Sequence, residues 1–270
     1  MTRAADKVEA AKQELIIYLP DTRGVTISRW GRGNLKLGMD GVYTYSRLPG
    51  RPDGLYESIA FAAGFEPGTS TGTCPGSSVE CESICYAKRV VGTPAIWEVW
   101  KRNSETEYLP SYVDDPLPPD AKIVRLHVSG DFSSVTYIDE WEKLARCRPD
   151  VLFFGYTRSW RVPELLRPLE RFRALPNVQL FASMDKSIDE MPSSGWRRAW
   201  LEDDLRAISG GGSGVEMGLE FFLGEGVHNF TAEDGKPSYI CPEETGRRAN
   251  CQECNYCITG KRGDVIFLLH

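Results

Sequence analysis

Histidine is scarce in this chain, with only three residues among 270. The chain therefore has too few imidazole ligands for a zinc or non-haem iron site built mainly from histidine, so cysteine thiolates would have to be the main metal ligands. The chain also lacks an excess of positive charge, because its formal net charge is −6. Sequence-independent nucleic-acid binding needs a basic surface, so the net charge does not indicate nucleic acid as a partner. The pairs Arg197-Arg198 and Arg247-Arg248 remain candidates for a local basic patch.

Long apolar runs are also missing. No stretch approaches the ~18 apolar residues that a membrane span needs. The first seventeen residues are charged and helical in character, unlike a secretory signal peptide. We therefore expect a cytoplasmic protein with no membrane partner. Disulfides are rare in that reducing compartment, so they are the disfavoured explanation for its cysteines.

Cysteine, by contrast, is concentrated. Seven of the eight cysteines fall into two compact groups, and the eighth, Cys147, is expected as a buried apolar residue at a helix end. The first group has six and three residues between its members, and the second has nine, two and two. Compact thiol groups usually bind metal or form disulfides. The predicted metal ligands are Cys74, Cys81, Cys85, Cys241, Cys251, Cys254 and Cys257.

The C-terminal group, residues 241–257, is the more specific signal. Its Cys-x-x-Cys-x-x-Cys run, with a remote Cys241-Pro242, is typical of a ferredoxin-type [4Fe–4S] site. Thiols three positions apart can reach neighbouring irons of a cube, whereas a third thiol from one short run strains a single zinc. Zinc nevertheless remains an alternative, because four thiolates suit it well.

The first group supplies only three thiolates, which leaves one position of a four-iron cluster open. A substrate, a cofactor, water, or a side chain such as Lys88 or His127 could fill that position, as could a fourth cysteine from the C-terminal group. The chain would then hold one or two [4Fe–4S] clusters. The sequence does not determine how many clusters there are or whether the two cysteine groups share one site.

The clearest structural pattern lies between residues 121 and 187. Short apolar strands are predicted from Lys122, Val151 and Val178, and amphipathic helices follow the first two. This alternation predicts a parallel α/β sheet, open or closed into a barrel. Further helices are expected at 4–16 and 94–105, and further strands at 215–223 and 264–269. We expect an N-terminal lead-in over residues 1–33 and one α/β domain over 34–270.

The turns after the three predicted strands carry polar residues. Because crossovers between parallel strands are almost always right-handed, these turns should meet at one edge of the sheet. Ligands bind at that edge in parallel α/β folds. Asp131 and Ser133 would also suit a helix N-cap, so capping remains the alternative role there. The predicted cofactor-binding residues are Ser129, Gly130, Asp131, Arg158 and Asp185.

Several segments together resemble a known family. They are Cys74-Pro75-Gly76, Cys85-Tyr86-Ala87, Arg125 to Phe132, Tyr156 to Trp160 and Phe181 to Ser183. With the terminal cysteines, they look like the "gene product 88" family of bacteriophage and plasmid proteins, from about residue 34 to the end. The resemblance implies a phage origin and a place in the host cytoplasm, and says little about activity.

A more distant similarity is to radical S-adenosylmethionine enzymes, which carry a three-cysteine loop after the first barrel strand and a glycine-containing turn after the second. The same order occurs here, with Ser129-Gly130-Asp131 as the turn. This similarity implies a partial barrel and S-adenosylmethionine bound at the open iron. It places Ser129, Gly130 and Asp131 beside that iron, with Arg158 and Asp185 lining the same mouth.

The leading hypothesis is therefore a phage-encoded iron–sulfur protein with redox or radical chemistry at an open cluster. A small-molecule substrate or a host redox partner would then be required. Two alternatives remain from the sequence. One is a non-catalytic zinc module that contacts a host protein or nucleic acid, and the other is an electron-transfer protein with closed clusters.

Overall fold

The computed structural model describes residues 28–52, 72–87, 93–110, 116–207, 226, 228–260 and 263–268. Its strands are β1 (Gly31–Arg32), β2 (Val42–Tyr45), β3 (Ile123–Leu126), β4 (Leu152–Thr157), β5 (Val178–Ser183), β6 (Arg197–Leu201), β7 (Asn229–Thr231), β8 (Pro237–Ile240) and β9 (Asp264–Phe267). Its helices are α3 (Val79–Ser83), α5 (Pro94–Ser104), α6 (Val135–Cys147), α7 (Pro163–Arg173) and α9 (Cys251–Cys254), with 3-10 turns η1 (Ser159–Arg161) and η2 (Leu205–Ala207).

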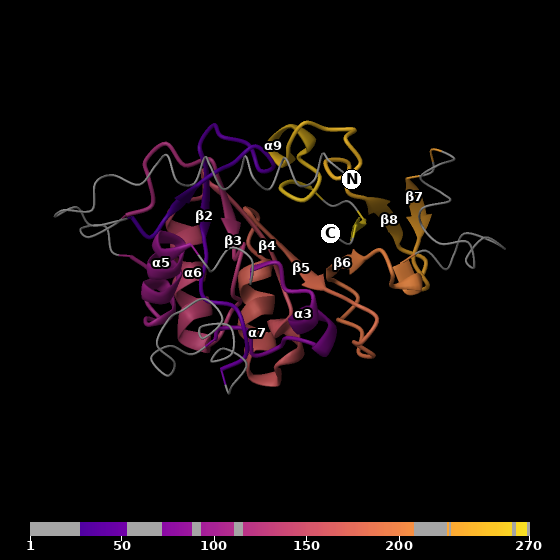
Figure 1. The fold of residues 1–270 in the computed structure, drawn as a ribbon, viewed down its shortest axis with the longest axis horizontal. Coiled ribbons are helices and arrows are strands. Elements are labelled where there is room, and N and C mark those ends of the chain that lie inside the picture. The colour runs from indigo at the N-terminus through magenta and orange to yellow at the C-terminus, as the bar shows by residue number, and fades with distance from the viewer. Residues whose placement is uncertain are drawn as a thin grey trace.

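All nine strands form one sheet in the order β1-β2-β3-β4-β5-β6-β9-β8-β7 (Figure 1). The seven inner strands of this sheet run parallel. The two strands at its ends, β1 and β7, pair antiparallel with β2 and β8. The predicted parallel α/β class is confirmed. The sheet is open, because β1 and β7 each pair with one strand only in the described part of the chain.

The predicted strand and helix pattern of the central region is also confirmed. β3, β4 and β5 begin within one residue of the predicted starts, and α6 and α7 connect them. The Ser134 hydroxyl accepts a hydrogen bond from the Tyr137 N–H at 3.2 Å, which fixes the start of α6. Ser134 is therefore the cap, so the alternative role of Asp131 or Ser133 as the cap of this helix is wrong. The expected elements at 4–16 and 215–223 lie outside the described residues.

The main core lies between the sheet and helices α6 and α7. Leu126 and Phe153 from the strands pack against Trp141 and Phe172 from the helices, and all four side chains are buried. Alternate strand residues, such as Phe154 and Phe181, point to the other face, as strand periodicity requires. The C-terminal segment with α9 covers that second face, so α9 and helices α6 and α7 lie on opposite sides of the strands (Figure 1).

Two expectations about single residues are corrected by the tertiary structure. Arg198 belongs to the interior of β6, where it is 1% exposed and ion-paired with Asp264, so Arg197-Arg198 is not a surface patch. Cys147 ends α6 but is exposed, because it lies away from the stripe that faces the sheet. Among the described residues, no helix is long and apolar enough to cross the membrane.

Candidate functional site

The first cysteine group lies on a loop, residues 72–87, that docks against the carboxyl edge of the parallel strands. We call this segment the cysteine loop. The Cys74 N–H donates to the Gly50 carbonyl at 2.9 Å, which ties the loop to the segment after β2. A Cβ added to Gly76 would lie 2.1 Å from the Arg158 carbonyl oxygen, so the loop backbone presses directly against the turn after β4. Only glycine permits that approach.

Asp185 and Arg158 clamp the loop from the turns after β5 and β4. The Asp185 carboxylate accepts the Ser78 hydroxyl at 2.5 Å and pairs with the Arg158 Nη2 at 2.9 Å. Ser78 is the N-cap of α3, and its oxygen accepts the Cys81 N–H at 3.1 Å. Burial alone would raise the pKa of Asp185, but hydrogen bonds from Ser187 and Ser78 and the charge of Arg158 lower it. A buried carboxylate therefore holds the position of Cys81.

Asp131 joins the turns after β3 and β4. Its carboxylate accepts the Phe132 N–H at 2.8 Å, the Thr157 hydroxyl at 2.6 Å and the Arg158 N–H at 2.8 Å. Burial raises the pKa of this carboxyl, although these hydrogen bonds oppose the shift. The three charged residues predicted to contact a cofactor, Asp131, Arg158 and Asp185, thus meet at one edge, where their side chains bond to the protein.

Ser129 and Gly130 complete this edge. The Ser129 hydroxyl is buried and has no hydrogen-bond partner among the described residues. Buried hydroxyls are normally paired, so this oxygen has free capacity for a ligand. Gly130 has a φ of 79°, and an added Cβ would lie 2.5 Å from the Thr73 hydroxyl. The glycine therefore lets the β3 turn approach the cysteine loop.

The three thiols of the loop lie close enough to influence one another. Burial raises the pKa of Cys74 well above its usual value, and the charges of Asp131 and the other two loop cysteines add to this. Burial also raises the pKa of Cys81, while the nearby Arg158 guanidinium opposes the shift. All eight cysteines of the chain are described and none forms a disulfide. The disulfide alternative therefore has no support in the structure.

Lys88 and His127 were suggested as a fourth ligand of the first cluster, and the structure describes only His127. Lys88 lies outside the described residues. The His127 Nε2 lies 2.8 Å from the Tyr137 hydroxyl, and its ring packs edge-on against Phe132 inside the core. Burial, followed by the charge of Arg47, lowers the pKa of His127 well below its usual value. This histidine is therefore a packed core residue.

The second cysteine group covers the sheet face opposite the helices. Asn250 caps α9, which carries Cys251 and Cys254, and the Cys251 N–H donates to the Lys36 carbonyl at 2.7 Å. Cys251 and Cys257 pack against a cluster that contains Ile123 and Phe154. Cys241, which follows β8, lies with Cys254 and Cys257 in the adjacent cluster. The fold therefore brings the remote cysteine to the Cys-x-x-Cys-x-x-Cys run.

Cationic side chains surround this second group. Burial raises the pKa of Cys251 to about 12, with a contribution from Cys257, whereas Lys36 and Arg125 oppose the shift. Burial also raises the pKa of Cys257, and the charge of Arg197 opposes that shift. The Arg125 guanidinium also lies 4.2 Å above the ring centre of Tyr156. Positive charge is thus placed where bound thiolates would carry negative charge.

The donor set can be tested against the groups it was predicted to hold. Among the described residues, no three His, Cys, Asp or Glu side chains converge on a point that one metal ion could occupy. A cubane differs from a single ion, because it takes each thiolate on a different iron and needs no such convergence. Sulfur donors with neighbouring cations are compatible with a [4Fe–4S] cluster, and four thiolates also suit one zinc ion.

Some of these contributors were not predicted from the sequence. Lys36, Arg47 and Arg125 act on the sites through tertiary contacts. Arg47 is buried and donates to the carbonyls of Asn103 and Ser104 at the end of α5, both at 3.0 Å. The short strand β2 was not predicted, so nothing marked Arg47 as part of the edge. Arg125 could have been noticed as a charged residue in an otherwise apolar strand.

Comparison with known proteins identifies the family. A profile described as Gene product 88 matches residues 44–260. The "Gene 88 protein" of Mycobacterium phage L5 is 26% identical over 220 residues, which is 72% of this chain and 81% of the phage protein. The "Gene 88 protein" of Mycobacterium phage D29 matches with the same identity and coverage. No solved structure matches the chain. The profile spans both cysteine groups, so this chain belongs to the gene product 88 family, as its motifs predicted.

Proposed function

We propose that this protein is an iron–sulfur protein that performs redox or radical chemistry at a [4Fe–4S] cluster held by the cysteine loop. One observation carries the proposal: the three-cysteine loop docks on the carboxyl edge of parallel strands, where α/β proteins bind their ligands. Cys74, Cys81 and Cys85 would hold three irons and leave the fourth open. The cluster supplies one-electron transfer when bound.

The residues around the loop suggest how a small molecule would be held there. Ser129 has a buried hydroxyl without a partner among the described residues, so it would bond to a polar group of the ligand. Asp185 and Arg158 would act as positioning residues, because Asp185 accepts the Ser78 hydroxyl of the loop and Arg158 donates to Asp185. Gly130 would keep the ligand side of the β3 turn open, since it has no side chain.

The order of the sheet supports S-adenosylmethionine as the ligand class. Strands β2 to β6 are parallel neighbours in chain order, as they would be in the first part of a βα barrel. The cysteine loop follows the first of these strands and the Ser129-Gly130-Asp131 turn follows the second. We therefore propose a partial, radical-S-adenosylmethionine-like barrel, in which Asp131 holds the β3 and β4 turns together.

The C-terminal group would hold a second, closed cluster through Cys241, Cys251, Cys254 and Cys257. Lys36, Arg125 and Arg197 would offset its negative charge. We propose the host cytoplasm as the compartment, because its reducing conditions keep such thiols free of disulfides. A host redox protein would then supply the electrons.

Metal content tests this proposal. Protein made and handled without oxygen should contain iron and acid-labile sulfide in equal amounts, with about four irons for each cluster. Cys81→Ala should lose the iron of the first site, and the matched control Cys147→Ala should lose none, because Cys147 is exposed and belongs to neither group. Stoichiometric zinc without sulfide would refute the proposal and support the zinc-module alternative.

Electron paramagnetic resonance separates an open cluster from a closed one. Adding S-adenosylmethionine to the reduced protein should change the spectrum of the first cluster and leave that of Cys81→Ala unchanged. Cleavage of S-adenosylmethionine by the reduced protein would then distinguish an enzyme from an electron carrier. A spectrum that does not respond would contradict the open site, even if both clusters are present.

A further inference from the structure

A short turn ahead of β2 contacts both parts of the second cysteine group. It comprises residues 34–40, which we call the N-terminal turn. The Asn34 side-chain oxygen accepts the Leu37 N–H at 2.9 Å and closes this turn. Lys36 of the turn is hydrogen-bonded to Glu244, which follows Cys241 closely, although the two residues are 208 positions apart. The turn therefore belongs to the surroundings of this group, although it contains no cysteine itself.

The backbone of the N-terminal turn holds α9. The Cys251 N–H donates to the Lys36 carbonyl at 2.7 Å, and the Gln252 N–H donates to the Leu37 carbonyl at 3.0 Å. The first N–H groups of a helix have no partner within the helix, so these carbonyls satisfy two of them. Gly38 has a φ of 101°, and an added Cβ would lie 2.5 Å from the Cβ of Gln252. The turn and α9 are therefore in close backbone contact.

The side chain of Lys36 holds the other part of the group, the segment that carries Cys241. Its Nζ lies 2.9 Å from Oε1 of Glu244 and 3.4 Å from Oε2 of Glu243, and both glutamate side chains are only 4% exposed. The second oxygen of Glu244 accepts the Leu268 N–H at 2.8 Å, which fixes this carboxylate. One residue thus contacts α9 through its backbone and the Cys241 segment through its side chain.

The charges around Cys241 explain why a cation is needed at this position. Burial raises the pKa of Cys241 and the charge of Glu244 adds to this, whereas the charge of Lys36 opposes the shift. Burial alone would lower the pKa of Lys36, but Glu244 and Glu243 raise it above its usual value. The lysine is therefore protonated at neutral pH. Without it, a thiolate at Cys241 would lie beside two buried carboxylates, which is electrostatically unfavourable.

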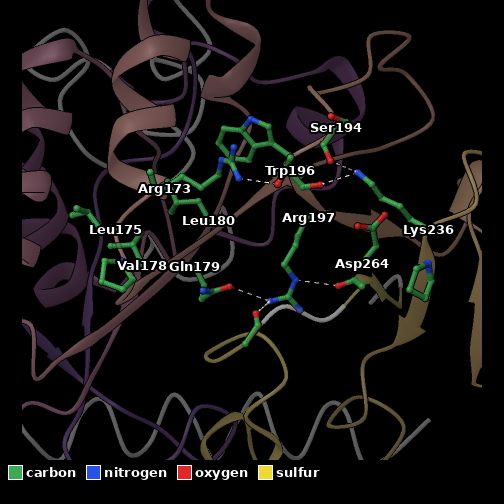
Figure 2. Close-up of a pocket in the computed structure, with 16 residues that line it drawn as sticks. Arg173, Leu175, Val178, Gln179, Leu180, Ser194, Trp196, Arg197, Lys236 and Asp264 are labelled. Carbon is green, nitrogen blue, oxygen red and sulfur yellow. Dashed lines mark hydrogen bonds between the residues drawn. The ribbon is translucent and has the colours of Figure 1, made fainter.

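The other end of the C-terminal cysteine segment is held by a different cation, Arg197, which lines the cavity shown in Figure 2. Its guanidinium donates to the carbonyls of Tyr256 and Gly263, both at 3.1 Å, and to the Gln179 amide oxygen at 3.3 Å (Figure 2). Because Tyr256 is the neighbour of Cys257, Arg197 fixes the end of the cysteine run. The Cys257 end thus has an anchor that does not involve Lys36.

We infer that Lys36 is the positioning residue that joins Cys241 to α9 and so completes the four-thiolate site of the second cysteine group. The inference rests on the proposed function, in which these four thiolates hold the closed cluster. It deepens that proposal, because a residue outside both cysteine groups decides whether the remote cysteine can bind. When the lysine is absent, the metal site should lose Cys241 as a ligand before it loses the cysteines of the run.

Metal retention by the full-length protein tests this role. Cys81→Ala should keep only the second site, so its remaining metal reports on that site alone. Adding Lys36→Met should weaken retention against a chelator about 10- to 100-fold, the usual loss when a group that orients a metal ligand is removed. Lys36→Arg should restore retention, because a guanidinium can also pair with the two carboxylates. Lys122→Met is the matched control, because this exposed lysine pairs with Asp40 of the same turn at 2.6 Å.

A further substitution shows whether Lys36 acts through Cys241. Cys241→Ala should weaken retention by itself, and Lys36→Met should add little to it, because the ligand that the lysine positions is then gone. A full additional loss would contradict the role, as would equal retention in Lys36→Met and Lys122→Met. With Cys81 intact, the electron paramagnetic resonance spectrum of the first cluster should be the same in Lys36→Met as in the wild type, which shows that the effect is local.

Failure of this inference can be distinguished from failure of the proposed function. Zinc without sulfide would refute the cluster, but the same comparison of variants would still decide the role of Lys36, because the same thiolates bind zinc. For protein that holds no metal, the rate of alkylation at Cys241 decides, since this cysteine is 6% exposed. Lys36→Met should raise that rate about tenfold, as expected when a charged hydrogen bond no longer opposes local opening, and Lys36→Arg should not. An unchanged rate in Lys36→Met would overturn the inference.

Discussion

Replacing Asp185 tests most directly how the fold holds the cysteine loop. This carboxylate is fully buried and pairs with Arg158, which is only 16% exposed. It also accepts hydrogen bonds from Ser78 and Ser187. Asp185→Asn keeps the shape of the side chain but removes its charge, which leaves the guanidinium buried beside a neutral amide. Breaking a buried pair in this way costs about 3–5 kcal/mol of folding free energy.

The same variant should loosen the loop itself. Ser78 caps α3, so the Cys81 backbone loses a fixed anchor when Asp185 no longer holds the serine. Urea unfolding measures the loss of stability, and the rate of thiol modification at Cys81 measures the loosening. Asp150→Asn is the matched control, because Asp150 is 61% exposed and its pair with Arg148 should contribute at most about 1 kcal/mol.

The pH dependence of stability gives an independent check. Burial tends to raise the pKa of Asp185, but its hydrogen bonds and Arg158 bring the net value below that of an unfolded chain. A lowered pKa in the folded state adds stability above the unfolded value of about 3.9, and this is lost as the pH falls through the folded value. The wild type should therefore lose more stability than Asp185→Asn below about pH 4. A variant within about 1 kcal/mol of the wild type at pH 7 would refute the clamp.

Three further substitutions test other parts of the fold by urea unfolding. Gly130→Ala should destabilise the protein by about 1–3 kcal/mol more than Gly235→Ala, because both have positive φ but only Gly130 has atoms within 4 Å of the added Cβ. Equal losses of unfolding free energy in the two variants would show that the atoms around Gly130 leave room for a methyl group. Arg198→Met should cost about 3–5 kcal/mol by leaving a buried carboxylate unpaired, against at most about 1 kcal/mol for the exposed Arg171→Met. Asn177→Ala should cost about 1–3 kcal/mol, because its amide donates to three backbone carbonyls, and a smaller loss would mean that water replaces it.

Local sequence pattern was sufficient for the central βα units. The apolar stripes of α6 and α7 and the strands between them repeat over distances that a helix or strand itself imposes, so β3, β4 and β5 could be placed within a residue. The parallel class and the common edge of the three turns followed from the alternation and from the handedness of crossovers. The cysteine groups and the other motifs, taken together, identified the family.

Other elements depended on partners far away in the chain. Strands β2, β6 and β8 were not predicted. They lie outside the strand–helix alternation of residues 121–187, and neighbouring strands complete their hydrogen bonds. Arg198 resembled a surface charge because its partner, Asp264, is 66 residues away.

What each polar residue does was likewise decided by the tertiary structure. The sequence by itself determined that Asp131, Arg158 and Asp185 would meet at one edge, because parallel strands end together. Only the folded chain shows that they bond to the cysteine loop and to neighbouring turns, and that the Ser129 hydroxyl has no hydrogen-bond partner among the described residues. A local pattern reflects the covalent neighbours of a residue, whereas hydrogen-bond satisfaction and charge pairing depend on every segment that the fold brings within a few ångströms.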